Sequence, residues 1–279
     1  AVLIGGAAAD TITGGNGNVW AVGDEASVTV SNGRITSIAS SGSGVGASDT
    51  IEVGNGENII IGGVGADDIT AGIGTNTIIG DEGLVNFNTT GALILAESTN
   101  PAIGSADLFD LGQGIYRVIA GAGNERIELG PGTNFVIGDA GRIRVNEDET
   151  TTMESIAHTV SGNDEIIVSE GFNVLIGGSG ADTIRVQEGT SGSTDHVGIA
   201  LGDNGSMTFT STGLLHRIQS NASDPNGGND TVELTSGINT VIGGVGNDII
   251  TAGGGRNVVF GDDGEAFFNS NGTLSTARS

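Results

Sequence analysis

Aliphatic residues recur along this chain in steps of nine. In residues 44–79 they occupy the eighth position of successive nonapeptides, while the sixth position is polar. The nonapeptides read GVGASDTIE, VGNGENIII, GGVGADDIT and AGIGTNTII, so that position eight is Ile51, Ile60, Ile69 and Ile78. A short apolar segment between glycine-rich turns is typical of a short β-strand. We therefore predict one strand in each nonapeptide, with the position-eight side chain turned inward.

A second hydrophobic pattern lies between the nonapeptide blocks. Each interval begins with a Gly-Asp tag, and the residues four and six places after the aspartate are apolar. These are Val28 and Val30, Val85 and Phe87, Ile143 and Val145, Met207 and Phe209, and Ala266 and Phe268. Such alternation predicts a half-buried strand, and turn residues followed by a further apolar group predict a β-hairpin excursion. A widened coil of the same solenoid is the alternative.

The nonapeptide blocks keep phase in modules that we place at residues 1–43, 44–101, 102–158, 159–224 and 225–279. The third module departs most from the pattern, since Tyr116 and Glu125 stand at its sixth positions, and an insertion at Thr190–His196 interrupts the fourth. Repetition at a fixed period predicts a solenoid, here one continuous array over 1–279. Because the chain opens and closes inside repeats, we expect it to be a segment of a longer array.

The nonapeptide at Gly62–Thr70 follows the pattern G-G-x-G-x-D-x-U-x, which is the calcium-binding unit of a parallel β-helix. On these residues the chain resembles the repeats-in-toxin (RTX) family of secreted bacterial proteins. The resemblance implies an all-β fold, a parallel β-roll or β-solenoid of glycine-rich nonapeptides, with the β-hairpin excursions between modules. It also implies that two nonapeptides complete one coil, with six residues in each turn and three in each strand.

With two nonapeptides in a coil, the sixth positions fall on two opposite edges. Asp49 then lies over Asp67, with the tag residue Asp81 on the same edge, and Asn58 lies over Asn76 on the other. Two carboxylates about 4.8 Å apart repel by roughly 3.5 kcal/mol at an effective dielectric constant near 20. Calcium prefers carboxylate and carbonyl oxygens. The asparagine edge carries no charge, and we predict a ladder of side-chain hydrogen bonds there.

We therefore predict Ca²⁺ along the aspartate edge alone, although isolated aspartates often only cap turns. The predicted metal ligands are Asp10, Asp24, Asp49, Asp67, Asp81, Asp107, Asp139, Asp164, Asp182, Asp203, Asp230, Asp248 and Asp262.

Composition narrows the classes of partner. The 279 residues include 52 glycines, no cysteine and no lysine, and the net charge is −25. Such a surface repels nucleic acid and anionic lipid. No apolar run is long enough for a membrane span, and residues 1–10 lack the charged region of a signal peptide. We predict no nucleic-acid partner and no membrane insertion, and the absence of cysteine fits an extracellular protein stabilised by metal.

Catalytic motifs are absent from the sequence. Without cysteine or lysine there is no thiol or Schiff-base chemistry, and no nucleophile elbow, Walker loop or HExxH occurs. We expect His158, His196 and His216 to be solvated loop residues, because they share no motif position. The chain is predicted to be no enzyme.

The predicted function is structural. We expect a calcium-stabilised segment of a large secreted bacterial surface protein, such as an adhesin extender, a filament or a surface-layer component. Charge repulsion would keep it unfolded where calcium is scarce, and Ca²⁺ outside the cell would fold it. The resemblance implies type I secretion. Self-association into fibres or a surface layer is a further predicted interaction. The alternatives are the calcium module of a secreted enzyme and an adhesin face for glycans or cells, at Glu147–Glu149 or Thr190–His196.

Overall fold

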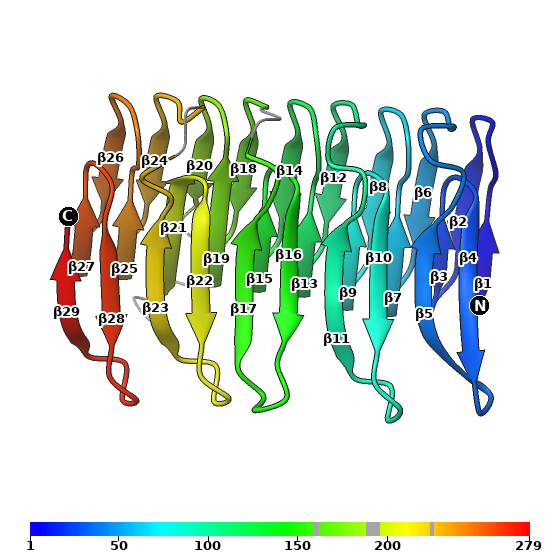
Figure 1. Cartoon of the computed structure of the whole chain (residues 1–279), viewed down its shortest axis with the longest axis horizontal. Coiled ribbons are helices and arrows are strands. Elements are labelled where there is room, and N and C mark those ends of the chain that lie inside the picture. The colour runs from blue at the N-terminus through cyan, green and yellow to red at the C-terminus, as the bar shows by residue number, and fades with distance from the viewer. Residues whose placement is uncertain (159–161, 188–195, 224–225) are drawn as a thin grey trace.

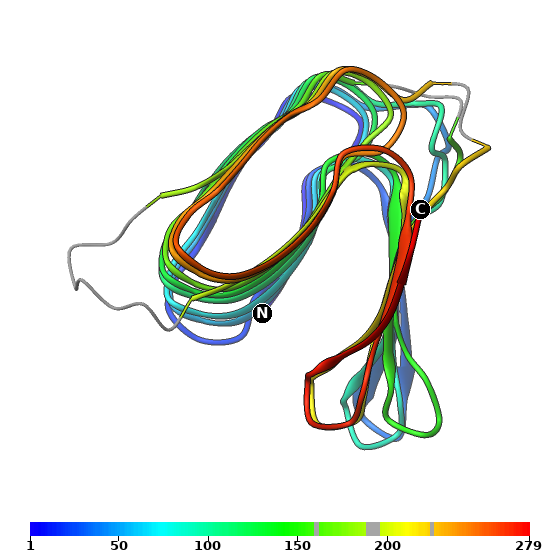
Figure 2. The same ribbon diagram turned by 90° about the vertical axis from the view of Figure 1, so that its left-hand side faces the viewer.

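A computed structural model describes residues 1–158, 162–187, 196–223 and 226–279. Within these residues the chain forms β-strands joined by turns and bends, so that the predicted all-β class is confirmed. The strands lie side by side in sequence order along the longest axis (Figure 1). Seen along that axis, successive coils superimpose as a closed loop with a row of hairpins beside it (Figure 2). The described residues contain no helix that is long and apolar enough to cross a membrane.

The closed loop is built from two parallel sheets. We call the longer-stranded one sheet A and its partner sheet B. Sheet A consists of β1 (Val2–Ile4), β3 (Trp20–Val22), β7 (Gly56–Ile61), β9 (Gly74–Ile79), β13 (Gly114–Ile119), β15 (Gly132–Ile137), β19 (Gly171–Gly178), β21 (Val197–Asp203), β25 (Gly237–Ile242) and β27 (Gly255–Phe260). Sheet B consists of β2 (Thr11–Gly14), β6 (Thr50–Val53), β8 (Asp68–Ala71), β12 (Leu108–Leu111), β14 (Arg126–Leu129), β18 (Glu165–Val168), β20 (Thr183–Val186), β24 (Thr231–Leu234) and β26 (Ile249–Ala252).

The position-eight side chains fill the space between sheets A and B, as predicted. Ile51, Ile60, Ile69 and Ile78 are each 0% exposed and belong to one apolar core. The strands are longer than the predicted three residues, with four in β6 and six in β7. Sheet A strands extend further because both of their faces are buried, and the continuous apolar run Ile59–Ile61 is the sequence signal of that burial.

The intervals between the blocks form hairpins, and the hairpins pair with one another. The result is an antiparallel sheet, sheet C, rather than a series of separate excursions. Its strands are β4 (Ala26–Ser31), β5 (Arg34–Ser40), β10 (Gly83–Phe87), β11 (Leu93–Ser98), β16 (Gly141–Val145), β17 (Thr151–Ser155), β22 (Gly205–Phe209), β23 (Leu215–Ser220), β28 (Glu265–Phe268) and β29 (Leu274–Arg278). Pairing between modules runs, for example, from Ala96 in β11 to Ile143 in β16.

A second apolar core joins sheet C to the outer face of sheet A. The tag-plus-four residues Val85, Ile143, Met207 and Ala266 are at most 1% exposed in this core. The molecule therefore has three layers, B, A and C, with sheet A in the middle. This arrangement leaves two solenoid edges where sheet A turns into sheet B, and those edges carry the position-six residues.

Two sequence predictions for loops have different outcomes. Most of the insertion at Thr190–His196 lies outside the described residues, so its candidate role as an adhesive face is not tested. His196 itself is described, and the prediction that it is solvated is wrong: it is 7% exposed, and its Nε2 lies 3.4 Å from Oε2 of Glu170. His216 is exposed, and His158 is half-buried.

Candidate calcium-binding edge

One solenoid edge stacks the position-six acids directly above one another. In the turn 62–67, Asp67 Oδ1 accepts a hydrogen bond from the backbone N–H of Asp49 at 2.7 Å. The same contact joins Asp10 to Asp49 and Asp67 to Asp107, and it resumes in the later modules. We call this stack the acidic column; its rungs are Asp10, Asp49, Asp67, Asp107, Glu125, Asp164, Asp182, Asp230 and Asp248.

The tag aspartates lie on the same edge but in a second row. Asp24 Oδ2 accepts the N–H of Val64, the third residue of the turn in the following coil. Asp81 accepts the N–H of Ala122 in the same way. Asp139 and Asp203 repeat the contact with Ser179 and Val245. We call Asp24, Asp81, Asp139 and Asp203 the tag row. Asp81 thus lies on the predicted edge, but it does not extend the stack of Asp49 and Asp67, because the next rung of the column is Asp107.

Glycines are required where the backbone approaches these carboxylates. A Cβ at Gly62 would overlap the carbonyl oxygen of Gly80 and Oδ2 of Asp67. Gly63 has φ +117°, which side-chain-bearing residues rarely adopt, and a Cβ there would meet the Asp24 carboxylate. The glycine pair of the nonapeptide therefore makes room for one acid from the column and one from the tag row.

Every acid of the column from Asp49 to Asp248 keeps a buried carboxylate oxygen that no protein group satisfies. In Asp67 one oxygen accepts the backbone N–H, whereas Oδ2 is buried without a hydrogen-bond partner. The same holds for Oδ2 of Asp49, Asp107, Asp164, Asp182, Asp230 and Asp248, for both carboxylate oxygens of Glu125, and for Oδ1 of Asp24 and Asp81. An unsatisfied buried acceptor costs about 1–3 kcal/mol, and more when it is charged. The edge is thus incomplete without a cation or protons.

Burial and mutual repulsion both raise the pKa values of these acids. Burial, followed by the neighbouring charges of Asp49 and Asp24, raises the pKa of Asp67 to about 7. Burial and the charge of Asp81 raise the pKa of Asp107 to about 9. For Asp81 and Asp230 the same causes raise the pKa to about 8. Protons therefore compete with any metal ion for this edge at neutral pH.

Among the described residues, one tight group of three acids lies where the third module meets the fourth. Ligand oxygens of Glu125, Asp139 and Asp164 all lie within 4.8 Å of one another, and the three residues are buried. Burial and the Asp164 carboxylate raise the pKa of Glu125 strongly. Glu125 was not among the predicted ligands, because its longer side chain made the third module doubtful. The signal that identifies Glu125 as a candidate ligand is its place at the sixth position of its nonapeptide.

The opposite edge is closed by its own hydrogen bonds, as predicted. Asn58 Nδ2 donates to Asn76 Oδ1 at 2.8 Å and to the carbonyl of Gly54 at 3.0 Å. Asn134 to Asn173 and Asn239 to Asn257 repeat the ladder contact. We call this the asparagine ladder. The amide nitrogens thus bind carbonyl oxygens within the protein, and no charge is buried.

Tyr116 takes an asparagine position without opening the ladder edge. Its ring is 0% exposed, and its hydroxyl lies 2.6 Å from the carbonyl of Gly72, the same oxygen to which Asn76 donates. The neighbouring Asn134 Oδ1 is buried without a partner as a result of the substitution. The aromatic residue therefore replaces most, though not all, of the hydrogen bonding of an asparagine.

The predicted ligands differ in burial according to their place along the rod. Asp10 and Asp248, at the two ends of the column, are half-buried, and Asp262 is exposed. The others are at most 3% exposed; they are Asp24, Asp49, Asp67, Asp81, Asp107, Asp139, Asp164, Asp182, Asp203 and Asp230. The structure thus brings all but the terminal predicted residues together in the interior of one edge.

Comparison with protein families gives one result. A family model described as RTX calcium-binding nonapeptide repeat (4 copies) matches residues 2–23, 43–83, 117–142, 158–190, 225–259 and 233–266. These segments cover more than half of the chain and contain most of the parallel coils, whereas much of sheet C falls between them. Comparison with curated proteins and with solved structures finds no match.

Proposed function

Because this chain belongs to the family of RTX calcium-binding nonapeptide repeat proteins, its repeats bind Ca²⁺, and we propose that the ions bind along the acidic column and the tag row. The observation that carries this assignment is the set of buried carboxylate oxygens without a hydrogen-bond partner. In Asp67, Oδ1 would keep its hydrogen bond from the backbone N–H of Asp49, and Oδ2 would coordinate the ion. The asparagine ladder would hold no calcium.

The donor set fits calcium better than magnesium. Carboxylate and turn carbonyl oxygens meet at this edge, and calcium accepts six to eight such ligands in flexible geometry. Magnesium requires near-octahedral geometry and loses its water reluctantly. We propose Glu125, Asp139 and Asp164 as the best-formed of the sites, since their oxygens converge within one buried cluster. Bound calcium would balance the negative charge of the three carboxylates.

We further propose that the chain serves as a non-catalytic, calcium-stiffened segment of a secreted bacterial surface protein. Support comes from three sheets that run the length of the described chain, with the acids stacked along one edge of the rod. Without calcium, repulsion along the column opposes folding. Extracellular calcium modules have dissociation constants of about 10⁻⁴–10⁻³ M. Because an ion that binds only the folded state stabilises that state, calcium outside the cell would favour folding. Export by type I secretion and a role as adhesin extender, filament or surface-layer component belong to this proposal.

The test is a calcium titration of the whole chain. In EDTA at pH 7.5 we expect the far-UV circular dichroism of an unfolded chain, and millimolar Ca²⁺ should produce a cooperative β-sheet spectrum. Magnesium at the same concentration is the control and should leave the chain largely unfolded. A calcium-free chain with the same β-sheet spectrum and the same melting temperature as the loaded one would contradict the proposal.

A further inference from the structure

The hairpin tips of sheet C diverge from sheet A and leave a wedge between the two sheets (Figure 2). Large aromatic side chains fill this wedge in the first four modules. Trp20 packs on Phe87 with ring centroids 4.8 Å apart, and Phe135, Phe172 and Phe209 form a cluster with centroids 5.7–6.3 Å apart. The wedge is therefore part of the second apolar core over most of its length.

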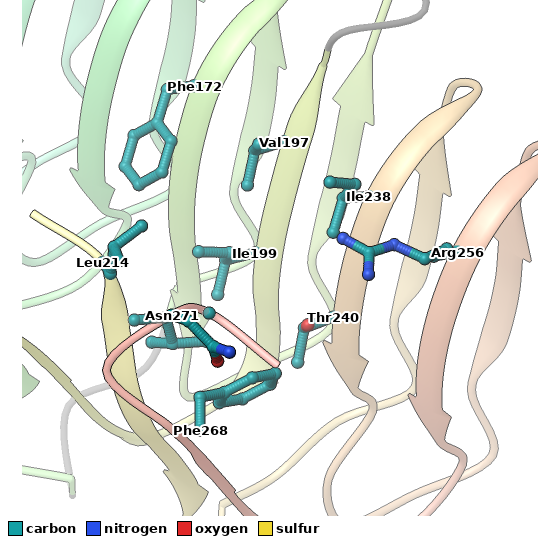
Figure 3. A pocket seen from close by; sticks show the side chains of 11 residues that line it. Phe172, Val197, Ile199, Leu214, Ile238, Thr240, Arg256, Phe268 and Asn271 are labelled. Atoms are coloured by element: carbon teal, nitrogen blue, oxygen red, sulfur yellow. The ribbon is translucent and has the colours of Figure 1, made fainter. Parts of the chain in front are cut away.

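Near the fourth and fifth modules the side chains do not fill the space between sheets A and C completely. A cavity of about 190 Å³ opens between β19, β21, β25 and β27 on one side and the tips of the β22–β23 and β28–β29 hairpins on the other (Figure 3). Strand register explains the opening. The row that begins with Phe172 continues through Val197 and Ile238 to Arg256, so that two aliphatic residues follow the aromatic ring. Ile238 and the facing Leu214 are 44% and 38% exposed.

Two polar side chains at the cavity, those of Arg256 and Asn271, can act as hydrogen-bond donors. Arg256 is exposed, and within the described residues its guanidinium forms no hydrogen bond or ion pair, although the chain has 34 acidic residues. Asn271 Oδ1 accepts the backbone N–H and the hydroxyl of Thr273. Its amide nitrogen is left to donate elsewhere. In Figure 3 Arg256 extends from β27 toward Ile238, and Asn271 lies on the hairpin loop beside Phe268.

We propose that this cavity binds a small organic acid whose body is an aliphatic chain or a single aromatic ring. The body would contact Phe172, Ile199 and Ile238, and the carboxylate would accept hydrogen bonds from Arg256 and Asn271. A dry cavity of about 150 Å³ is sufficient for benzene, whereas drug-sized ligands need about 300–1,000 Å³. The size thus fits one ring or a short chain and excludes a nucleotide or a large cofactor. The site is independent of the calcium edge.

The probe is 3-phenylpropionate, added to the calcium-loaded chain and followed by methyl NMR. We expect shifts of the methyl groups of Val197, Ile199, Leu214 and Ile238, with a Kd near millimolar. The neutral analogue 3-phenylpropan-1-ol should bind at least fivefold more weakly, because its hydroxyl carries no charge for Arg256. N-acetylglycyl-phenylalanine separates the two sources of such a group: binding tighter than that of phenylpropionate indicates the carboxyl terminus of a partner protein, and weaker binding indicates a free acid.

Two variants and a control decide the assignment. Arg256→Gln should raise the Kd of phenylpropionate about tenfold and leave that of the alcohol unchanged. Arg144→Gln, at another exposed arginine on β16, should change neither. Ile238→Trp should fill the cavity and abolish the methyl shifts. Equal affinities for acid and alcohol, equal effects of the two arginine variants, or no shifts at the solubility limit of the probe would each overturn the proposal.

Discussion

The two edges of the solenoid have the same phase, the same glycine-rich repeat and the same parallel strands on either side, yet they differ in how they satisfy their buried polar groups. On the ladder edge, Asn58 donates to Asn76 and to a carbonyl, so each rung supplies what the next one needs. On the acidic edge, Asp67 accepts one N–H and has nothing to donate. Exchanging an NH₂ group for a charged oxygen thus turns a self-sufficient edge into one that requires a cation.

The turns of the two edges differ as well. On the acidic edge, six residues separate β7 from β8, and Asp67 is the last of them. On the ladder edge only two residues separate β6 from β7, and Asn58 lies inside β7. A long turn brings backbone carbonyls beside the carboxylates, whereas a short one leaves the asparagine in the regular strand ladder. The sixth position of the nonapeptide therefore lies at the end of a turn on the acidic edge and inside a strand on the ladder edge.

The largest expected difference between the edges is the response of the melting temperature to calcium. The slope of Tm against the logarithm of calcium concentration reports the number of ions released on unfolding. Asp67→Ala should lower this slope, because it removes a rung whose free oxygen faces the proposed ions; loss of one site filled at a hundred times its Kd costs about 2.7 kcal/mol.

Asn76→Ala is the matched variant on the other edge. It should lower Tm by the same amount at every calcium concentration, since it removes hydrogen bonds to Asn58 and Gly72 worth about 1–3 kcal/mol. Its slope should equal that of the unmodified chain. Parallel losses of slope in the two variants would mean that the edges do not differ in calcium binding.

A smaller effect is expected from one acid of the tight cluster. Glu125→Gln keeps the size of the side chain and removes its charge, so isothermal titration should find about one calcium ion fewer per chain. Glu128→Gln is the control, because Glu128 lies on the adjoining strand with 45% of its side chain exposed and pairs with Arg126. An unchanged stoichiometry in Glu125→Gln would remove the junction of modules three and four from the proposed sites.

The smallest expected effect is the pH dependence of the calcium-free fold. The pKa of Asp67 rises from 3.8 in the reference state to about 7, and that of Asp107 to about 9. The folded chain thus binds more protons than the unfolded chain between these values, so its stability is greatest below pH 4 and is lost as the pH rises through 7 to 9. In EDTA, where the chain is largely unfolded at pH 7.5, the residual β-sheet signal in far-UV circular dichroism should therefore be larger at pH 5 than at pH 8. The opposite order, with the β-sheet signal rising toward pH 8, would exclude repulsion along the column as the reason for calcium dependence.

The repeat period predicted much of this architecture. Position eight identified the core between sheets A and B, and the alternation of aspartate with asparagine identified the two edges. Both follow from local spacing, because nine residues return the chain to the same place in the next half-coil.

Features that depend on contacts between modules could not be read from the spacing. The hairpins were predicted singly, but their pairing into sheet C depends on the rise of the solenoid, which brings Ala96 beside Ile143. The spacing also does not show that the tag aspartates form a row of their own. That row depends on contacts such as the one from the backbone N–H of Val64 to Asp24, which lie on opposite sides of the β4–β5 hairpin in the sequence. The length of the Glu125 side chain suggests a poor ligand, whereas strand pairing between β12 and β14 sets its place in the column.

The most direct test is the location of calcium in crystals of the loaded chain, measured by anomalous diffraction. The proposed arrangement predicts anomalous peaks beside Asp49, Asp67, Asp81 and their equivalents along the acidic column and tag row. It predicts none beside Asn58 and Asn76. Peaks of equal height on both edges, or an acidic edge without calcium at saturating concentration, would contradict a one-edged calcium rod.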